Sequence, residues 1–173
     1  TLVVSAAGTT VNVSGGAGDD TIAMGAGDNT VGGGDGTDIL SIGAAVDVDD
    51  TVSGFETLNV TGAVAQDMDF LDGNTIATVA DGVGGANAIS FTDASASVSG
   101  LATSTAANTS SVTVDRKVDT TDDSLTITLR GGDQTAVTVN DEETLTVDSS
   151  TAATTITTLN AAAVTSITVT GDE

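Results

Sequence analysis

Apolar residues recur every nine positions near the start of the chain, and turns rich in glycine and aspartate separate them. The recurring positions are Val13, Ile22, Val31 and Leu40. One apolar residue flanked by polar ones indicates a very short strand that points a single side chain inward. The pattern predicts a stack of such strands from about Ala6 to Asp50, because at Asp49 the period requires an apolar residue and fails.

Residues 51–173 contain short segments in which apolar and polar residues alternate, and the turns between them are rich in Gly, Asp, Asn and Ser. No segment keeps a helical period, so all of these segments are predicted to be strands. They are Thr57–Thr61, Met68–Phe70, Thr75–Val79, Ile89–Phe91, Val112–Val114, Leu125–Leu129, Ala136–Val139, Thr144–Val147, Thr154–Thr158 and Ser166–Thr170. We therefore expect an all-β fold, with a short parallel β-roll in residues 1–50 followed by a β-solenoid or a β-sandwich in residues 51–173.

One segment of this region is repeated. Val52–Val60 and Val139–Val147 share the pattern V-x-x-x-E-T-L-x-V. Because the Glu and the Leu keep their places, we interpret the pattern as a repeated element that starts a strand, in preference to coincidence in a chain rich in Thr and Val.

The nine-residue repeat also carries candidate metal ligands. Gly15–Ala23 and Gly33–Ser41 both fit G-G-x-G-x-D-x-U-x, where U is apolar, and this is a calcium-binding β-roll repeat. Two repeats make one coil, so Asp20 is expected to lie above Asp38, 18 positions later. Carboxylate and turn carbonyl oxygens are hard ligands that suit Ca²⁺. The predicted turn ligands are the backbones of Gly16, Gly18, Gly34 and Gly36.

The opposite edge of the roll is expected to be weaker. There Asn29 stands where the repeat has Asp, and its partner 18 positions later is Asp47. An amide oxygen and one carboxylate would bind calcium with one charge fewer.

Gly8–Asp50, together with the following Gly54–Val60, resembles the calcium-binding RTX-type surface-layer proteins of Gram-negative bacteria. The strand-rich segment Val164–Gly171 is similar to their β-rich body. The resemblance implies secretion to the bacterial cell surface, folding in external calcium, and self-association into a two-dimensional lattice, with Asp20 and Asp38 as metal ligands. Cell-surface polysaccharide is a further partner expected through other parts of a full-length chain. The alternative is a segment of a large RTX adhesin.

The formal net charge is −22, and the only cationic residues are Arg116, Lys117 and Arg130. Nucleic acid and anionic membranes would be repelled by such a chain. Calcium loading and a generally acidic surface, as in halophilic proteins, both explain the charge. No segment has the length and apolar character of a membrane span.

Enzymatic activity is not expected. The chain has no His and no Cys, which removes the H-E-x-x-H zinc site and His-dependent triads. There is no G-x-S-x-G motif, and without Trp or Tyr there is no aromatic platform for a sugar. Two acidic groups remain as possible further calcium ligands, Asp47/Asp49/Asp50 and Asp119/Asp122/Asp123, although solvated turns are favoured for both.

Overall fold

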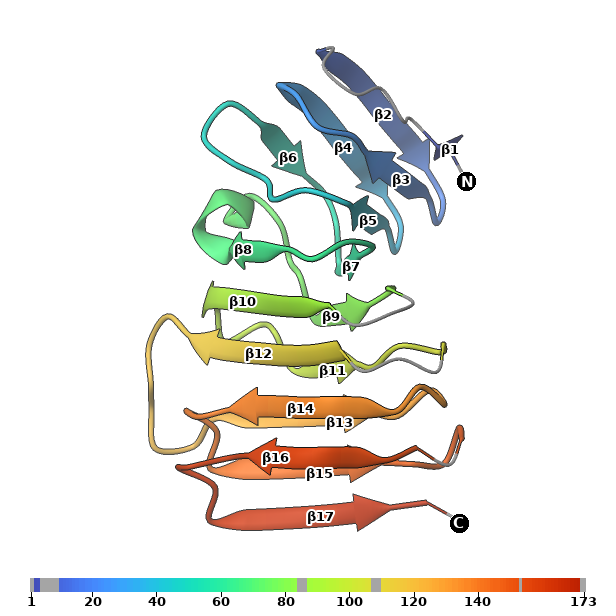
Figure 1. The fold of residues 1–173 in the computed structure, drawn as a ribbon. Coiled ribbons are helices and arrows are strands. Elements are labelled where there is room, and N and C mark those ends of the chain that lie inside the picture. The colour runs from blue at the N-terminus through green and yellow to red at the C-terminus, as the bar shows by residue number, and fades with distance from the viewer. Residues whose placement is uncertain (1, 4–9, 84–86, 107–109, 153, 172–173) are drawn as a thin grey trace.

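The chain folds into an all-β solenoid of about seven turns. The computed structural model describes residues 2–3, 10–83, 87–106, 110–152 and 154–171, so part of the predicted start of the roll, Ala6 to Thr9, lies outside the described residues. Figure 1 shows the coils stacked from the N-terminal to the C-terminal end, with successive strands alternating between two facing layers. Every strand pair in the described part of the chain is parallel. Residues 51–173 therefore form a solenoid and not a sandwich, because sandwich sheets are antiparallel.

One layer is a nine-stranded sheet, here named the long sheet. Its strands, in hydrogen-bonded order, are β1 (Leu2–Val3), β3 (Thr21–Met24), β5 (Ile39–Ile42), β7 (Thr57–Val60), β9 (Thr78–Asp81), β11 (Gly100–Ala102), β13 (Ser124–Thr128), β15 (Thr144–Asp148) and β17 (Ser166–Thr170). Its register aligns one apolar residue from each coil, starting with Ile22, Leu40 and Leu58, each 0% exposed. Burying each such side chain contributes about 1.5–3 kcal/mol.

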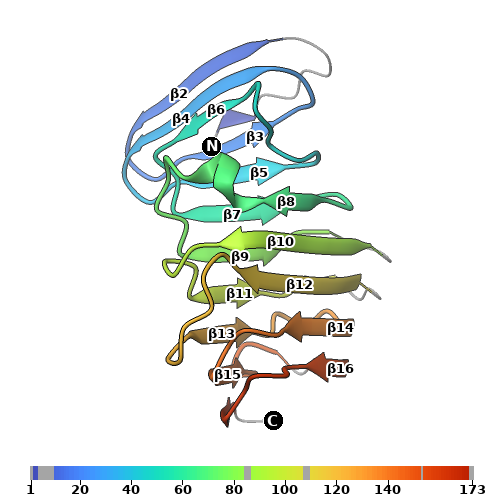
Figure 2. The same ribbon diagram turned by 90° about the vertical axis from the view of Figure 1, so that its left-hand side faces the viewer.

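The facing layer is divided into two sheets, as the view in Figure 2 also shows. The first contains β2 (Val11–Ala17), β4 (Asn29–Asp35) and β6 (Thr51–Ser53). The second contains β8 (Ala65–Asp67), β10 (Ala88–Ala94), β12 (Ser110–Arg116), β14 (Gln134–Val139) and β16 (Ile156–Asn160).

A single 3₁₀ turn, η1 (Met68–Leu71), follows β8 and contacts both β6 and β10. The strand predicted at Met68–Phe70 is therefore wrong. The Asp67 side chain accepts a hydrogen bond from the Asp69 N–H at 3.0 Å, which caps the turn, and Met68 and Leu71 are buried beneath it. Residues three apart lie on the same side of a 3₁₀ turn, whereas in a strand they would point to opposite faces.

One apolar core runs through the stack from Ile22 to Val147. The long sheet is continuous where β5 pairs with β7, so residue 50, the predicted division, falls within one continuous structure. What changes along the stack is coil length. Leu40 and Leu58 are 18 positions apart, whereas Leu58 pairs with Val79, 21 positions later. Among the described residues there is no helix long and apolar enough to span a membrane.

Candidate metal-binding corners

The part of the chain that the structure describes has no pocket. The predicted ligands lie in the turns that connect the two layers. The glycines predicted as turn ligands all have positive φ, which an L side chain adopts only with strain. The φ values are 98° for Gly16, 95° for Gly18, 114° for Gly34 and 147° for Gly36. Successive turns stack in register, since Gly16 pairs with Gly34.

Acidic residues form a ladder at the corner where the chain enters the long sheet. Asp20, Asp38 and Glu56 immediately precede β3, β5 and β7. The Asp20 N–H donates to Asp38 Oδ1 at 2.7 Å, and the Asp38 N–H donates to Glu56 Oε2 at 2.7 Å. The predicted stacking of Asp20 on Asp38 is confirmed. Glu56, a further 18 positions along, is the next member of the ladder and was not among the predicted ligands.

The second oxygen of Asp38 has no partner at this corner. Asp38 is 0% exposed, and its Oδ2 atom is buried without a hydrogen bond from any residue that the structure describes. A methyl group built on Gly33 would lie 2.6 Å from Asp38 Oδ2 and would overlap the Gly54 carbonyl oxygen. One coil earlier, a methyl group on Gly15 would lie 2.7 Å from Asp20 Oδ2 and 2.5 Å from the Gly33 carbonyl oxygen.

At both Gly15 and Gly33, therefore, one carboxylate oxygen and one carbonyl oxygen lie beside the position that a Cβ atom would occupy. We name this arrangement the Asp38 corner, comprising Asp20, Asp38 and Glu56 with the backbones of Gly15, Gly33 and Gly54. Its potential ligand atoms are all oxygens, and they include the carboxylates of three successive residues of the ladder, so the residues present fit a hard divalent cation such as Ca²⁺.

The opposite corner differs from the prediction. Thr30 pairs with Thr51, so Asn29 lies beside Asp50 and not beside Asp47. The connection from β5 to this layer is three residues longer than the connection from β3, which moves the partner from position 47 to position 50. Asp47 is exposed and its Oδ1 accepts a hydrogen bond from the Asp49 N–H within its own turn.

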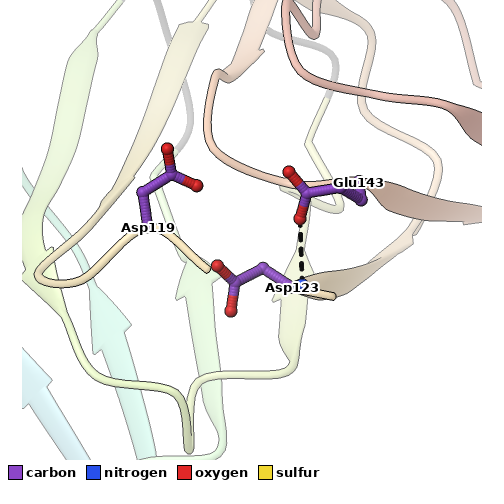
Figure 3. Close-up of side chains that lie close together, drawn as sticks. All are labelled: Asp119, Asp123 and Glu143. Atoms are coloured by element: carbon purple, nitrogen blue, oxygen red, sulfur yellow. Dashed lines mark hydrogen bonds between the residues drawn. The ribbon is translucent and has the colours of Figure 1, made fainter. Parts of the chain in front are cut away.

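A second acidic group lies farther along the solenoid, where Asp119, Asp123 and Glu143 bring carboxylate oxygens within 4.8 Å of one another (Figure 3). The Asp123 N–H donates to Glu143 Oε2 at 3.0 Å, and Asp123 Oδ2 accepts from the Thr120 N–H at 2.7 Å. Asp119 is exposed. These hydrogen bonds hold Asp123 and Glu143 in place without an ion.

The same contact explains the repeated sequence element. Glu143 accepts the N–H of an aspartate one coil earlier, as Glu56 does, and each Glu immediately precedes a long-sheet strand. Leu58 and Leu145, which follow two positions later, are each 0% exposed. The interpretation of V-x-x-x-E-T-L-x-V as an element that starts a strand is confirmed.

Compared with protein-family models, with curated proteins and with solved structures, the chain showed no significant match.

Proposed function

We propose that the Asp38 corner binds Ca²⁺ and that the chain is a structural component of a calcium-dependent surface layer on the outside of a bacterial cell. The observation that carries the metal proposal is Asp38 Oδ2, a buried carboxylate oxygen without a hydrogen-bond donor. An anionic oxygen withdrawn from water is costly unless a donor or a cation compensates it. A cation beside Gly33 would compensate Asp38 Oδ2 and would also take up the Gly54 carbonyl oxygen.

Calcium would act on folding as well as on charge. The acids of the ladder are one coil apart, so the cation sites form only when the coils stack. Binding free energy then becomes folding free energy. The N-terminal coils need this contribution, since each nonapeptide supplies only one or two apolar side chains to the core, such as Ile22 from one repeat and Met24 and Val31 from the next.

A structural role is supported by the resemblance of the repeats to those of RTX-type surface-layer proteins and by the form of the molecule. Parallel coils around one continuous core make a rigid, elongated body, and contacts between such bodies depend on their outer faces. On the outward face of the long sheet, an uncharged column is formed by Thr126, Thr146 and Thr168. Two acidic chains could approach each other along such a surface with little carboxylate repulsion. We propose no catalytic activity for this chain.

The metal proposal is tested by thermal unfolding and calorimetric titration of the full chain with calcium. Calcium at 100 times its Kd would stabilise the fold by about 2.7 kcal/mol per site. We expect the unfolding midpoint to rise with calcium in the wild type and much less in Asp38→Ala. The matched control is Asp28→Ala, which removes an exposed carboxylate from the same region. Equal calcium responses in the two variants would overturn the assignment of the site.

A further inference from the structure

The buried amide of Asn29 holds together the corner opposite Asp38. Asn29 is 2% exposed, and its Nδ2 donates to Gly25 O at 3.2 Å, to Asp50 Oδ1 at 3.1 Å and, at short range, to Gly27 O. Three oxygens therefore converge on one nitrogen. The Asn29 N–H donates to the same Asp50 oxygen at 2.9 Å. We name Asn29, Asp50 and the backbones of Gly25 and Gly27 the Asn29 corner.

Two turn carbonyl oxygens and a carboxylate oxygen are the kind of donor set that Ca²⁺ takes. At the Asn29 corner, however, the point on which they converge is filled by an amide nitrogen with hydrogens to donate. The Asp38 corner has the opposite arrangement, because no hydrogen-bond donor of the described residues reaches its buried Oδ2. The expectation that Asn29 ligates calcium through its amide oxygen therefore does not fit this geometry.

The orientation of the amide follows from its neighbours. Rotating it by a half turn would direct Oδ1 at three oxygens and would leave the Gly25 carbonyl, the Gly27 carbonyl and Asp50 facing another acceptor. The observed orientation avoids this repulsion, and as a consequence Asn29 Oδ1 is buried without a donor. Asn29 Oδ1 stays unpaired so that the NH₂ group can point inward. We therefore expect the structure of this corner to depend on the NH₂ group.

We propose that the Asn29 side-chain NH₂ occupies the place of a cation, so that this corner is closed by hydrogen bonds from the chain itself, without metal, while calcium binds at the opposite one. This inference rests on the proposed function only in that calcium is taken to bind at the Asp38 corner. It follows that one substitution should convert the corner. Asn29→Asp removes both amide hydrogens and adds a carboxylate beside Asp50, which leaves an all-oxygen set that needs a cation.

The test compares calcium stoichiometry by calorimetry and unfolding midpoints in chelator and in calcium, using the full chain. We expect Asn29→Asp to have a lower midpoint than the wild type in chelator, to regain most of it in calcium, and to bind one additional Ca²⁺. The matched control is Asn12→Asp, which makes the same change of charge at an exposed position of β2, opposite Thr30. It should gain no site and no calcium-dependent recovery.

Asn29→Ala provides the second measurement. Because it removes the NH₂ group without supplying a ligand, its midpoint should fall equally in chelator and in calcium, with the number of bound calcium ions unchanged. A lower calcium number in Asn29→Ala, or an Asn29→Asp variant that calcium does not rescue, would overturn the inference. If the wild type bound no calcium, the proposed function would fail, yet a first site appearing in Asn29→Asp would still support the inference.

Discussion

Gly32 and Gly33 show how strongly a single position can matter in a stacked turn. The two glycines are adjacent, yet a Cβ on Gly32 would meet nothing closer than 3.8 Å. A Cβ on Gly33 would overlap the carbonyl of the next coil and crowd Asp38 Oδ2. Neither residue has a positive φ, so the difference lies in the space beside the backbone and not in its conformation.

We therefore predict that Gly33→Ala destabilises the fold by about 1–3 kcal/mol, the usual cost of overpacking. It should also weaken calcium binding, because the methyl group enters the space between the two oxygens. Gly32→Ala should be neutral or stabilising by up to about 1 kcal/mol, since it reduces the entropy of the unfolded chain. Urea unfolding of both variants in calcium measures the difference. Equal losses of stability would contradict the close approach of Gly33 to the Gly54 carbonyl oxygen and Asp38 Oδ2.

At the scale of elements, a buried ion pair joins three successive coils at the end of β12. Arg116 Nε donates to Glu142 Oε1 at 2.7 Å, and the two side chains are 2% and 1% exposed. The same guanidinium donates to the carbonyl oxygens of Val98 and Ser124. Burial raises the pKa of Glu142, and Arg116 opposes part of that rise. The pair holds together connections that the strand ladders do not reach.

We predict that Arg116→Met costs about 3–5 kcal/mol at pH 7, because it leaves the Glu142 carboxylate buried without its cation. The double variant Arg116→Met/Glu142→Leu should recover most of this loss. Urea unfolding of the two single variants and the double variant gives the coupling energy directly. A double variant no more stable than Arg116→Met would show that the guanidinium acts mainly through its carbonyl contacts.

The pH dependence of the same variant has a definite sign. A carboxyl whose folded pKa is raised binds its proton more tightly in the folded chain, so its contribution to stability falls as pH rises through that pKa. Removing Arg116 raises the pKa of Glu142 further. The deficit of Arg116→Met relative to the wild type should therefore shrink as pH falls from 7 toward the titration range of Glu142. A deficit independent of pH would argue against an uncompensated charge.

At the scale of the whole molecule, the dominant property is a net charge of −22 on an elongated solenoid. Many of its acids lie in the turns and corners, as at Asp38 and Glu143, and not along the strand faces. Repulsion between such molecules is screened beyond about 8 Å at physiological salt. Monovalent salt can screen carboxylates but cannot bridge them, whereas calcium can do both and also stabilise the coils.

We therefore predict that the protein forms ordered sheets in millimolar calcium and disperses in chelator, and that added sodium chloride does not substitute. Light scattering and negative-stain imaging across the two titrations measure this. Sheets that form in sodium chloride with chelator would indicate simple screening of an acidic, halophile-like surface. A chain that stays monomeric under all conditions would favour the adhesin segment over the lattice component.

The sequence by itself determined the features that repeat at short, regular intervals. The nine-residue period was enough to predict that Ile22 and Leu40 point inward and that Asp20 stacks on Asp38, because neighbouring coils there have equal length. The likeness of Val52–Val60 to Val139–Val147 was likewise enough to identify the repeated element that starts β7 and β15. The same reasoning failed at Asp47. The failure of the period at Asp49 marked the break, but the pattern alone did not show that one connection is three residues longer, so that Val52 takes the apolar position and Asp50 becomes the partner of Asn29.

Only the tertiary structure decided the features that depend on which coils are neighbours. Alternation of apolar and polar residues is the same in a solenoid and in a sandwich, so the parallel pairing of residues 51–173 could not be read from it. The alternation predicts which way a side chain points but not its burial. Leu145 and Ile167 are partners in the same column, yet they are 0% and 52% exposed, because no described strand pairs with the outer side of β17. The contrast between the Asp38 and Asn29 corners likewise arises from atoms that approach each other only once the coils are stacked.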